Sequence, residues 1–357
     1  MGRYLAVGTI HKKEPCDLRI FFSHSETEFL VTGPDRDNLG LQKRSSREIL
    51  GDLGRHAFDL VFAGQNDFPY FNPRKGISRN LSNVFWKLLC HPSLLRGFFF
   101  PYSALRTRLI GLDLLDRPVI DTRRFRMLRH CVCYFKCQLP PNPCNAFLYA
   151  TAKTEDAGNV LHLDFFKRAI TKLRPISLGI DPAGTQDFST CAAEKKIDIF
   201  FAGDARNRPN RQAGIKQLER LKAEGYRVLI AQQPLPRGEF LERCAQSYIV
   251  WSPEGHGWDC FRHYESALAG SVPLMQSPTI RRYAPFKEDE QALYYYVEGD
   301  HLERRVRQAL QNRQRLLEMG QAARHHVLQW HTHEALRRYV IEETLNTVAA
   351  QRTNHSI

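Results

Sequence analysis

The stretch from residue 248 to residue 275 constrains the fold most, because it reads as two buried strands joined by a glycine loop and a helix. Its first five residues form an apolar run that Pro253 ends, since proline cannot donate to a sheet ladder. Glycines occupy two positions of the loop 254–257, and residues 260–269 place apolar side chains along one helical face. Residues 272–275 form the next apolar run. This order predicts a βαβ unit whose loop lies at the carboxyl edge of a parallel sheet, where open α/β folds bind ligands.

The loop at residues 254–257 has the chemistry of a phosphate-binding segment. Its glycines, Gly255 and Gly257, let backbone amides approach a ligand with no Cβ in the way. The following helix directs its free amides and the positive end of its dipole toward the same point, which favours an anion. His256 lies between the glycines and can donate a hydrogen bond to an oxyanion, so we name it as a candidate catalytic residue.

This stretch resembles the nucleotide-sugar motif of GT-B glycosyltransferases of the group-1 and exostosin-like kind. Those enzymes carry a loop of the type E-G-x-G, a helix with a second Glu, and a small-residue turn before a strand of the V-P-V-I type. Here residues 254–257 match the loop, Glu265 matches the second carboxylate, and residues 269–273 match the turn. Ten residues separate Glu254 from Glu265, where the retaining group-1 enzymes have seven, so retention or inversion of configuration stays open.

The resemblance implies that this half of the chain binds a nucleotide-activated sugar as substrate, with no metal and no further cofactor. Glu265 is then expected to accept hydrogen bonds from the ribose hydroxyls, and Arg262 to neutralise the leaving diphosphate. A basic residue after the first strand of this half holds the donor phosphates in that family, which points to Arg206 and Arg211. The other expected donor contacts are Gly203, Glu254, Gly255, Gly257, Trp258 and Asp259.

Each of these residues also has a purely structural interpretation. The arginines after the strand would then only solvate a polar loop, and Arg262 would pair with Glu265 or Glu254. A carboxylate near a helix N-terminus is favoured by the helix dipole alone. An indole such as Trp258 packs in a core as readily as it contacts a sugar.

Strands alternating with helices from residue 197 to residue 297 predict a parallel sheet with right-handed crossovers. Together with the resemblance, this predicts an α/β fold of two Rossmann-like domains facing a cleft, the GT-B architecture. We expect an N-terminal acceptor-binding α/β domain at residues 1–175 and a C-terminal Rossmann-like domain at residues 176–335 that binds the nucleotide sugar. Residues 336–357 are expected to form a helix that crosses back and a polar tail.

Several local expectations concern the elements around this framework. Short strands are expected at residues 18–23 and 118–121, and a helix over residues 302–330 with a break near Gly320. In the N-terminal half, Asp67 follows an apolar strand and is our candidate for the catalytic base. A loop aspartate is also a common turn residue. The histidines His11 and His24 are weaker candidates for the same role.

The charge of the chain narrows its partners. The chain has 51 Lys and Arg residues and 38 Asp and Glu residues, which gives a net charge of +13. Such a balance fits nucleic acid, an anionic membrane surface or phosphorylated substrates. No zinc-finger spacing or RNA-binding strand motif accompanies the charge, so we do not expect a nucleic-acid binder. Peripheral contact with an anionic membrane, near a lipid-linked acceptor, fits better.

The sequence also bears on compartment. It holds no apolar run of the ~18–20 residues that span a bilayer, and its first ten residues show no signal-peptide pattern. Nine cysteines scattered along the chain indicate reduced thiols rather than a disulfide framework. We therefore expect a cytoplasmic protein, at most peripheral to the inner face of a membrane.

These observations predict a glycosyltransferase that transfers a sugar from a nucleotide-activated donor to a glycan or glycolipid acceptor, in surface polysaccharide or lipopolysaccharide synthesis. Two alternatives remain within the same fold. One is a nucleotide-sugar epimerase, and the other is a non-catalytic relative that binds glycan or nucleotide.

Overall fold

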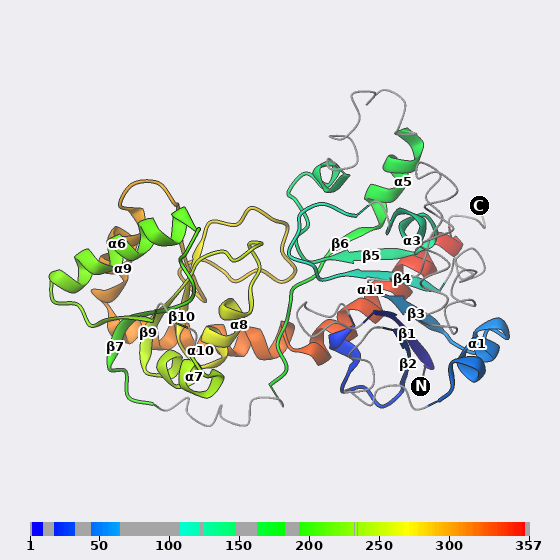
Figure 1. Ribbon diagram of the computed structural model, residues 1–357, viewed down its shortest axis with the longest axis horizontal. Helices are drawn as coiled ribbons and strands as arrows, with labels where there is room; N and C mark the ends of the chain where they lie inside the picture. The colour runs from blue at the N-terminus through cyan, green and yellow to red at the C-terminus, as the bar shows by residue number, and fades with distance from the viewer. Residues whose placement is uncertain are drawn as a thin grey trace. The chain divides into compact units, whose positions relative to one another are not determined.

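The computed structural model describes residues 2–9, 18–32, 44–64, 108–121, 124–147, 163–182, 193–231, 233 and 235–353. The chain divides into two compact units (Figure 1). The first comprises Met1–Ile176 together with Arg337–Ile357, and the second comprises Ser177–Leu336. Each unit has its own parallel sheet. None of the helices in the described ranges combines the length and apolar character that a bilayer-spanning segment needs.

The first unit is built on a six-stranded parallel sheet with the order β2-β1-β3-β4-β5-β6. Its strands are β1 (Tyr4–Thr9), β2 (Thr27–Thr32), β3 (Leu60–Ala63), β4 (Leu109–Asp113), β5 (Cys133–Lys136) and β6 (Leu173–Pro175). Its helices include α1 (Ser46–Gly54), α3 (Phe125–His130), α5 (Leu163–Lys172) and most of α11 (His333–Thr353), with 3-10 turns at Arg19–Phe21 and Pro143–Phe147. Strands β3, β4 and β5 are buried along their whole length, which explains their nearly continuous apolar sequences.

The C-terminal segment completes the core of the first unit, although it follows the second unit in the sequence. The Tyr339 ring meets the Phe135 ring edge-on at 5.4 Å, and the Tyr339 hydroxyl donates to the Pro175 carbonyl at 3.1 Å. Arg174 and Glu343 form an ion pair at 2.6 Å. These contacts join α11 to the strands β5 and β6.

The second unit has a five-stranded parallel sheet with the order β11-β10-β9-β7-β8. Its strands are β7 (Ile197–Ala202), β8 (Val228–Ala231), β9 (Ser247–Ser252), β10 (Val272–Gln276) and β11 (Leu293–Tyr295). Its helices are α6 (Pro209–Ala223), α7 (Arg237–Ala245), α8 (Phe261–Leu268), α9 (His301–Leu310) and α10 (Arg313–Trp330). The chain steps from β7 to β8 on one side and then to β9 on the other, so the strand order reverses between β7 and β9.

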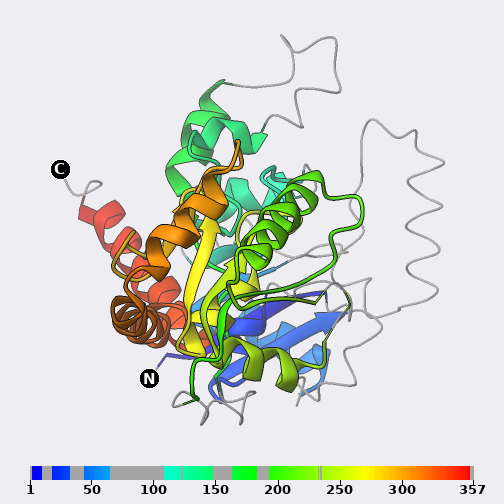
Figure 2. The same cartoon turned by 90° about the vertical axis from the view of Figure 1, so that its left-hand side faces the viewer.

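Helices cover both faces of this sheet (Figure 2). On one face, Phe201 and Trp251 pack in a core with side chains of α6, α9 and α10, and their ring centroids lie 4.5 Å apart. On the other face, Phe200 and Val250 pack against Cys244 of α7. Burial on both faces is why β7 and the interior of β9 are mostly apolar.

The structure corrects three sequence predictions and adds one strand. Residues 18–23 contain the 3-10 turn rather than a strand, and residues 118–121 form irregular backbone. Strand β4 was not expected from the sequence. The long helix breaks between α9 and α10, where the Asn312 side chain accepts from the Arg315 amide and caps α10. Gly320 is therefore not a break.

Gly320 lies inside α10 because its lack of a side chain lets two backbones approach. A Cβ at this position would lie 2.5 Å from the carbonyl oxygen of Gly270, in the turn before β10. Backbone at such a distance cannot move aside as a flexible side chain would. Glycine here serves close packing rather than flexibility.

Changing Gly320 to Ala is therefore expected to destabilise the second unit by about 1–3 kcal/mol, through overpacking. Gly51→Ala in α1 is the matched control, because its Cβ would meet only the end of the Arg55 side chain, at 3.7 Å. That change should stabilise the first unit by about 0.5–1 kcal/mol through helix propensity. Urea unfolding of both variants tests the pair, and an unchanged transition for Gly320→Ala contradicts the packing argument.

Candidate functional site

The candidate site lies where the strand order of the second unit reverses. Strands β7 and β9 are hydrogen-bonded neighbours, and the connections leaving their carboxyl ends run to α6 and to α8. Such a switch point separates two diverging loops, which leaves a crevice for a ligand in open α/β sheets. The predicted loop 254–257 follows β9 at this point.

Arg211 joins the two loops of the switch point. It lies in the first turn of α6, and only 8% of its surface is exposed. Its Nε and Nη2 donate to the Glu254 carbonyl at 3.1 and 2.7 Å, and its Nη1 donates to the Asp204 carbonyl at 2.8 Å. Burial, and then the nearby Arg262 and Arg208, lower the pKa of Arg211 to about 10. The chain thus keeps a buried cation beside two others.

Those two other arginines contact the same loop from different elements. Arg208, just before α6, donates from Nη1 to the Gly255 carbonyl at 2.7 Å and lies 3.1 Å from His256 Nε2. Arg262, in the first turn of α8, donates from Nη1 to the Pro253 carbonyl at 3.3 Å and lies 5.6 Å above the Phe201 ring. We call Arg208, Arg211 and Arg262 the arginine cluster.

The arginine cluster places three positive charges around the glycine loop. Within the described part of the chain, the ion pairs include none for these three side chains. Gly203 at the end of β7 makes room for the cluster, because a Cβ there would lie 3.0 Å from Arg262 Nη2. Three guanidinium groups around a glycine loop suit a phosphate or diphosphate, whose oxygens accept several charge-assisted hydrogen bonds.

The structure distinguishes the two arginines predicted for this loop. Arg211 lies in the cluster, whereas Arg206 is exposed and pairs with Asp204 at 3.0 Å. Arg208 was missed, although it lies two residues further along the same basic run. The signal available in the sequence was its place directly before Pro209, which starts α6 and so brings Arg208 to the sheet edge.

The glycine loop is closed by its own backbone. The Gly255 amide donates to the Gly257 carbonyl at 2.9 Å. The Glu254 side chain accepts from the Asn210 amide group at 3.3 Å, while its carbonyl serves Arg211. His256 is exposed and lies against Arg208. The loop thus presents backbone and imidazole groups beside the cluster.

Glu265 keeps its acceptor atoms available. Its side chain lies in the second turn of α8 and is 17% exposed, and Arg237 approaches to 3.7 Å. Burial raises the pKa of Glu265, and the attraction of Arg237 and Arg262 opposes that rise only in part. Among the described residues, none donates a hydrogen bond to this carboxylate. A largely buried carboxylate with such free acceptor atoms is suited to receive ligand hydroxyls.

The polar groups of Trp258 and Asp259 form hydrogen bonds inside the second unit. The Trp258 indole donates to the Gln276 carbonyl at 2.9 Å, and its side chain is buried. The Asp259 carboxylate accepts from the Leu178 amide at 2.7 Å and from the Tyr264 hydroxyl at 2.5 Å. Both polar groups are already occupied by the protein, so we leave the two residues out of the proposed donor site.

A cysteine–histidine pair at the start of α8 was not expected from the sequence. Cys260 precedes the helix, and its sulfur lies 3.6 Å from His263 Nε2, while His263 Nδ1 lies 2.7 Å from the Ser252 hydroxyl. Burial alone would raise the pKa of the Cys260 thiol, but His263, Arg262 and Ser252 outweigh it and bring it to about 7. The spacing C-x-x-H was the available signal, because it places both side chains on one helical turn.

Of the catalytic candidates predicted in the N-terminal half, only His24 lies within the described residues. Asp67 and His11 lie outside the described residues. His24 follows the 3-10 turn, and its Nδ1 lies 2.8 Å from the Thr27 hydroxyl. Its pKa is lowered, chiefly by burial. Across the described ranges, no group of three or more histidine, cysteine or acidic side chains is placed to hold a metal ion.

Comparison with known proteins identifies the fold. Neither a protein-family model nor a curated protein sequence matches the chain. Solved structures that resemble it include Anabaena HepE in complex with UDP, at 12% identity and a TM-score of 0.50, over 97% of this chain and 100% of HepE. A glycosyltransferase from Rickettsia africae matches at 9% identity and a TM-score of 0.52, over 97% and 98% of the two chains. The N-terminal domain of Candida albicans trehalose-6-phosphate phosphatase matches at 11% and 0.53, over 97% of each.

At these identities the likeness establishes architecture alone. The chain has a two-domain, Rossmann-like α/β fold of the GT-B kind, with a parallel sheet in each domain. The predicted fold class is confirmed in this respect. Function has to be argued from the site.

Proposed function

We propose that the protein is a glycosyltransferase whose second unit binds a nucleotide-activated sugar. The observation that carries this proposal is the arginine cluster, whose side chains form no ion pair with a described carboxylate, placed around the glycine loop and near the Glu265 carboxylate. The cluster supplies the positive charge for a diphosphate, and Glu265 supplies acceptors for a ribose. Cations for a diphosphate beside a carboxylate for a ribose fit a nucleoside diphosphate better than a neutral ligand or a simple phosphate.

The proposed chemistry is displacement at the anomeric carbon. The bond between that carbon and the diphosphate oxygen breaks, and the diphosphate leaves with the bonding electrons. A hydroxyl oxygen of the acceptor forms the new bond and gives up its proton to a base. Arg208, Arg211 and Arg262 would stabilise the charge that develops on the leaving group, because they are fixed in place before reaction.

The remaining assignments are proposals that rest on the fold and on the sequence. HepE was solved with UDP, and the Rickettsia africae protein is named a glycosyltransferase, which favours a nucleotide-sugar donor here. We propose that the first unit binds a glycan or glycolipid acceptor of surface polysaccharide or lipopolysaccharide synthesis, with peripheral membrane contact through the basic surface. Asp67 remains our candidate for the base, and His256 for a group that assists the leaving phosphate. The exostosin-like assignment belongs to this proposal.

A nucleotide screen tests the proposal. We expect UDP, GDP, TDP or one of their sugar conjugates to raise the Tm of the full chain, with EDTA present and no added metal. The preferred conjugate should release free nucleotide slowly, as hydrolysis without acceptor. Release of an epimerised sugar would indicate an epimerase, binding with no turnover would indicate a non-catalytic relative, and no response to any nucleotide would reject the proposal.

A pair of arginine variants locates the diphosphate. Arg262→Met should weaken UDP binding by about 10–100-fold, because a hydrogen bond to a charged group is lost. Arg206→Met is the matched control and should change affinity little, since Arg206 is exposed and paired with Asp204. Isothermal titration with UDP and with uridine separates the effects. A loss that is equal for uridine and UDP would contradict the phosphate assignment.

A further inference from the structure

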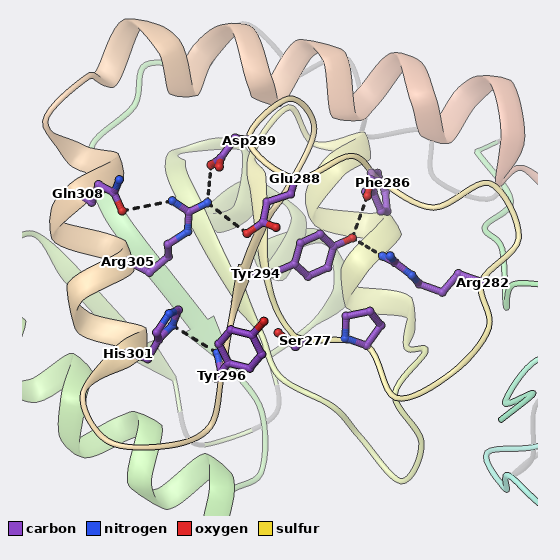
Figure 3. A pocket seen from close by; sticks show the side chains of 11 residues that line it. Ser277, Arg282, Phe286, Glu288, Asp289, Tyr294, Tyr296, His301, Arg305 and Gln308 are labelled. Carbon is purple, nitrogen blue, oxygen red and sulfur yellow. Dashed lines mark hydrogen bonds and ion pairs between the residues drawn. The ribbon is translucent and has the colours of Figure 1, made fainter. Parts of the chain in front are cut away.

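A cavity lies at the same sheet edge, outside the arginine cluster. It has a volume of about 620 Å³ and is bounded by the segments after β10 and β11 and by α9 (Figure 3). Ser277 directly follows β10, and Tyr296 directly follows β11. The volume falls within the ~300–1,000 Å³ of small-molecule sites. None of the residues lining it takes part in the proposed nucleotide site.

Tyr296 presents an aromatic ring to this cavity. Its side chain is 64% exposed, more than any other large hydrophobic side chain among those described as exposed. The Tyr296 amide donates to His301 Nδ1 at 3.3 Å, and the two rings meet edge-on with centroids 5.2 Å apart. His301 therefore holds the tyrosine in position. An aromatic ring fixed at the mouth of a cavity offers an apolar face to a ligand at little entropic cost.

Two carboxylates line the opposite part of the cavity. Glu288 and Asp289 are 57% and 64% exposed, and both contact the Arg305 guanidinium, which is itself only 12% exposed. Gln308 accepts from Arg305 Nη1 at 3.4 Å (Figure 3). Asp289 has a φ of 60°, an unusual conformation for a residue other than glycine. Arg305 thus orients both carboxylates while leaving oxygen atoms open to the cavity.

The charges that line the cavity disfavour phosphates and metal ions as ligands. Its two carboxylates balance its two guanidinium groups, Arg305 and Arg282. Arg282 lies above the rings of Trp258 and Tyr294, at 5.4 and 5.1 Å from their centroids. No excess positive charge is left for a phosphate, and the described acidic side chains form no metal-binding group. The cavity suits a neutral ligand with many hydroxyls.

We infer that this cavity binds a sugar residue of a glycan. The C–H face of a pyranose ring would lie on Tyr296, and its hydroxyls would donate to Glu288 and Asp289. A sugar has both an apolar face and a ring of hydroxyl donors, which matches an aromatic ring opposite oriented carboxylates. The inference goes beyond the proposed nucleotide site and holds whether or not that site binds a nucleotide.

Saturation-transfer NMR on the full chain without nucleotide tests this inference. The probes are the methyl pyranosides of glucose, galactose, mannose and N-acetylglucosamine. At least one should receive saturation on its ring C–H protons. Tyr296→Ala should lower the affinity for that sugar by about tenfold or more through loss of the aromatic contact, while Tyr296→Phe should leave the affinity unchanged. Trp330→Ala, at another partly exposed aromatic ring, is the matched control.

Three results would overturn the inference. These are no transfer to any of the four sugars, transfer that persists unchanged in Tyr296→Ala, or displacement of the bound sugar by inorganic phosphate. The nucleotide site can be judged separately, because Glu265→Ala should keep sugar binding. Wild-type protein that binds UDP but none of the four sugars rejects this inference alone, and wild-type protein that binds a sugar but no nucleotide rejects the proposed function alone.

Discussion

Replacement of Glu265 with alanine is expected to abolish the thermal stabilisation by the preferred nucleotide, with an affinity loss on the order of 100-fold. The Glu265 carboxylate is largely buried, and within the described chain it receives no hydrogen bond from the protein. Two ribose hydroxyls donating to it would satisfy those acceptors. Isothermal titration and a thermal-shift assay with UDP measure the loss.

The same variant should not destabilise the free protein. Burial raises the pKa of Glu265, so the charged carboxylate is disfavoured in the folded state and its removal costs little. Glu219→Ala, at an exposed position of α6, is the control and should leave UDP binding unchanged. A lower Tm of unliganded Glu265→Ala would mean that this glutamate is a structural residue.

A deoxy ligand tests directly whether Glu265 binds the ribose. Wild-type protein should bind 2′-deoxy-UDP more weakly than UDP, whereas Glu265→Ala should bind both equally. The reason is that the carboxylate and the 2′-hydroxyl form one interaction, so removing either partner removes it. If the deoxy penalty persists in the variant, the ribose role of Glu265 is wrong.

Asp113→Asn is expected to destabilise the first unit by about 3–5 kcal/mol. Asp113 ends β4 and is buried with Lys136 at 3.1 Å, Arg124 at 3.3 Å and the Tyr134 hydroxyl at 2.9 Å. Burial favours the neutral acid, but the two cations outweigh it and lower the pKa of Asp113. Asparagine keeps the shape and leaves two cations buried without their anion. Urea unfolding of the first unit measures the cost.

A second substitution separates charge from packing. In the Asp113→Asn background, Lys136→Met removes one of the uncompensated cations and should recover part of the lost stability. Asp59→Asn, at an exposed carboxylate, is the control and should cost about 1 kcal/mol or less. If the double variant is less stable than Asp113→Asn, the charge argument fails and packing dominates this cluster.

The successful sequence predictions share a physical basis. The strands, loop and helix of residues 248–275 are encoded by near-neighbour patterns: an apolar run, a proline stop, two glycines and a helical face. These patterns predicted β9, α8 and β10 within a residue or two. The same reasoning places Arg211 near the loop, because a helix that follows a parallel strand starts at the sheet edge.

Contacts between residues that are distant in sequence were not predicted. Trp258 and Asp259 follow the glycine loop and are predicted donor contacts; within the protein, the Trp258 indole donates to Gln276 and the Asp259 carboxylate accepts from Leu178. Gly320 was read as a helix break, but its reason is the backbone of Gly270, fifty residues earlier. Such contacts depend on how elements pack and leave no periodic trace in the sequence.

By itself, therefore, the sequence determined the α/β class, the parallel order of the second half and the glycine loop, because each depends on local conformation and hydrophobic periodicity. Only the tertiary structure decided which side chains meet there. It selected Arg208 over Arg206, and it brought Tyr296 and Glu288 to one cavity. The physical reason is that a site is formed by loops from separate strands, and their side chains come together only when the sheet assembles.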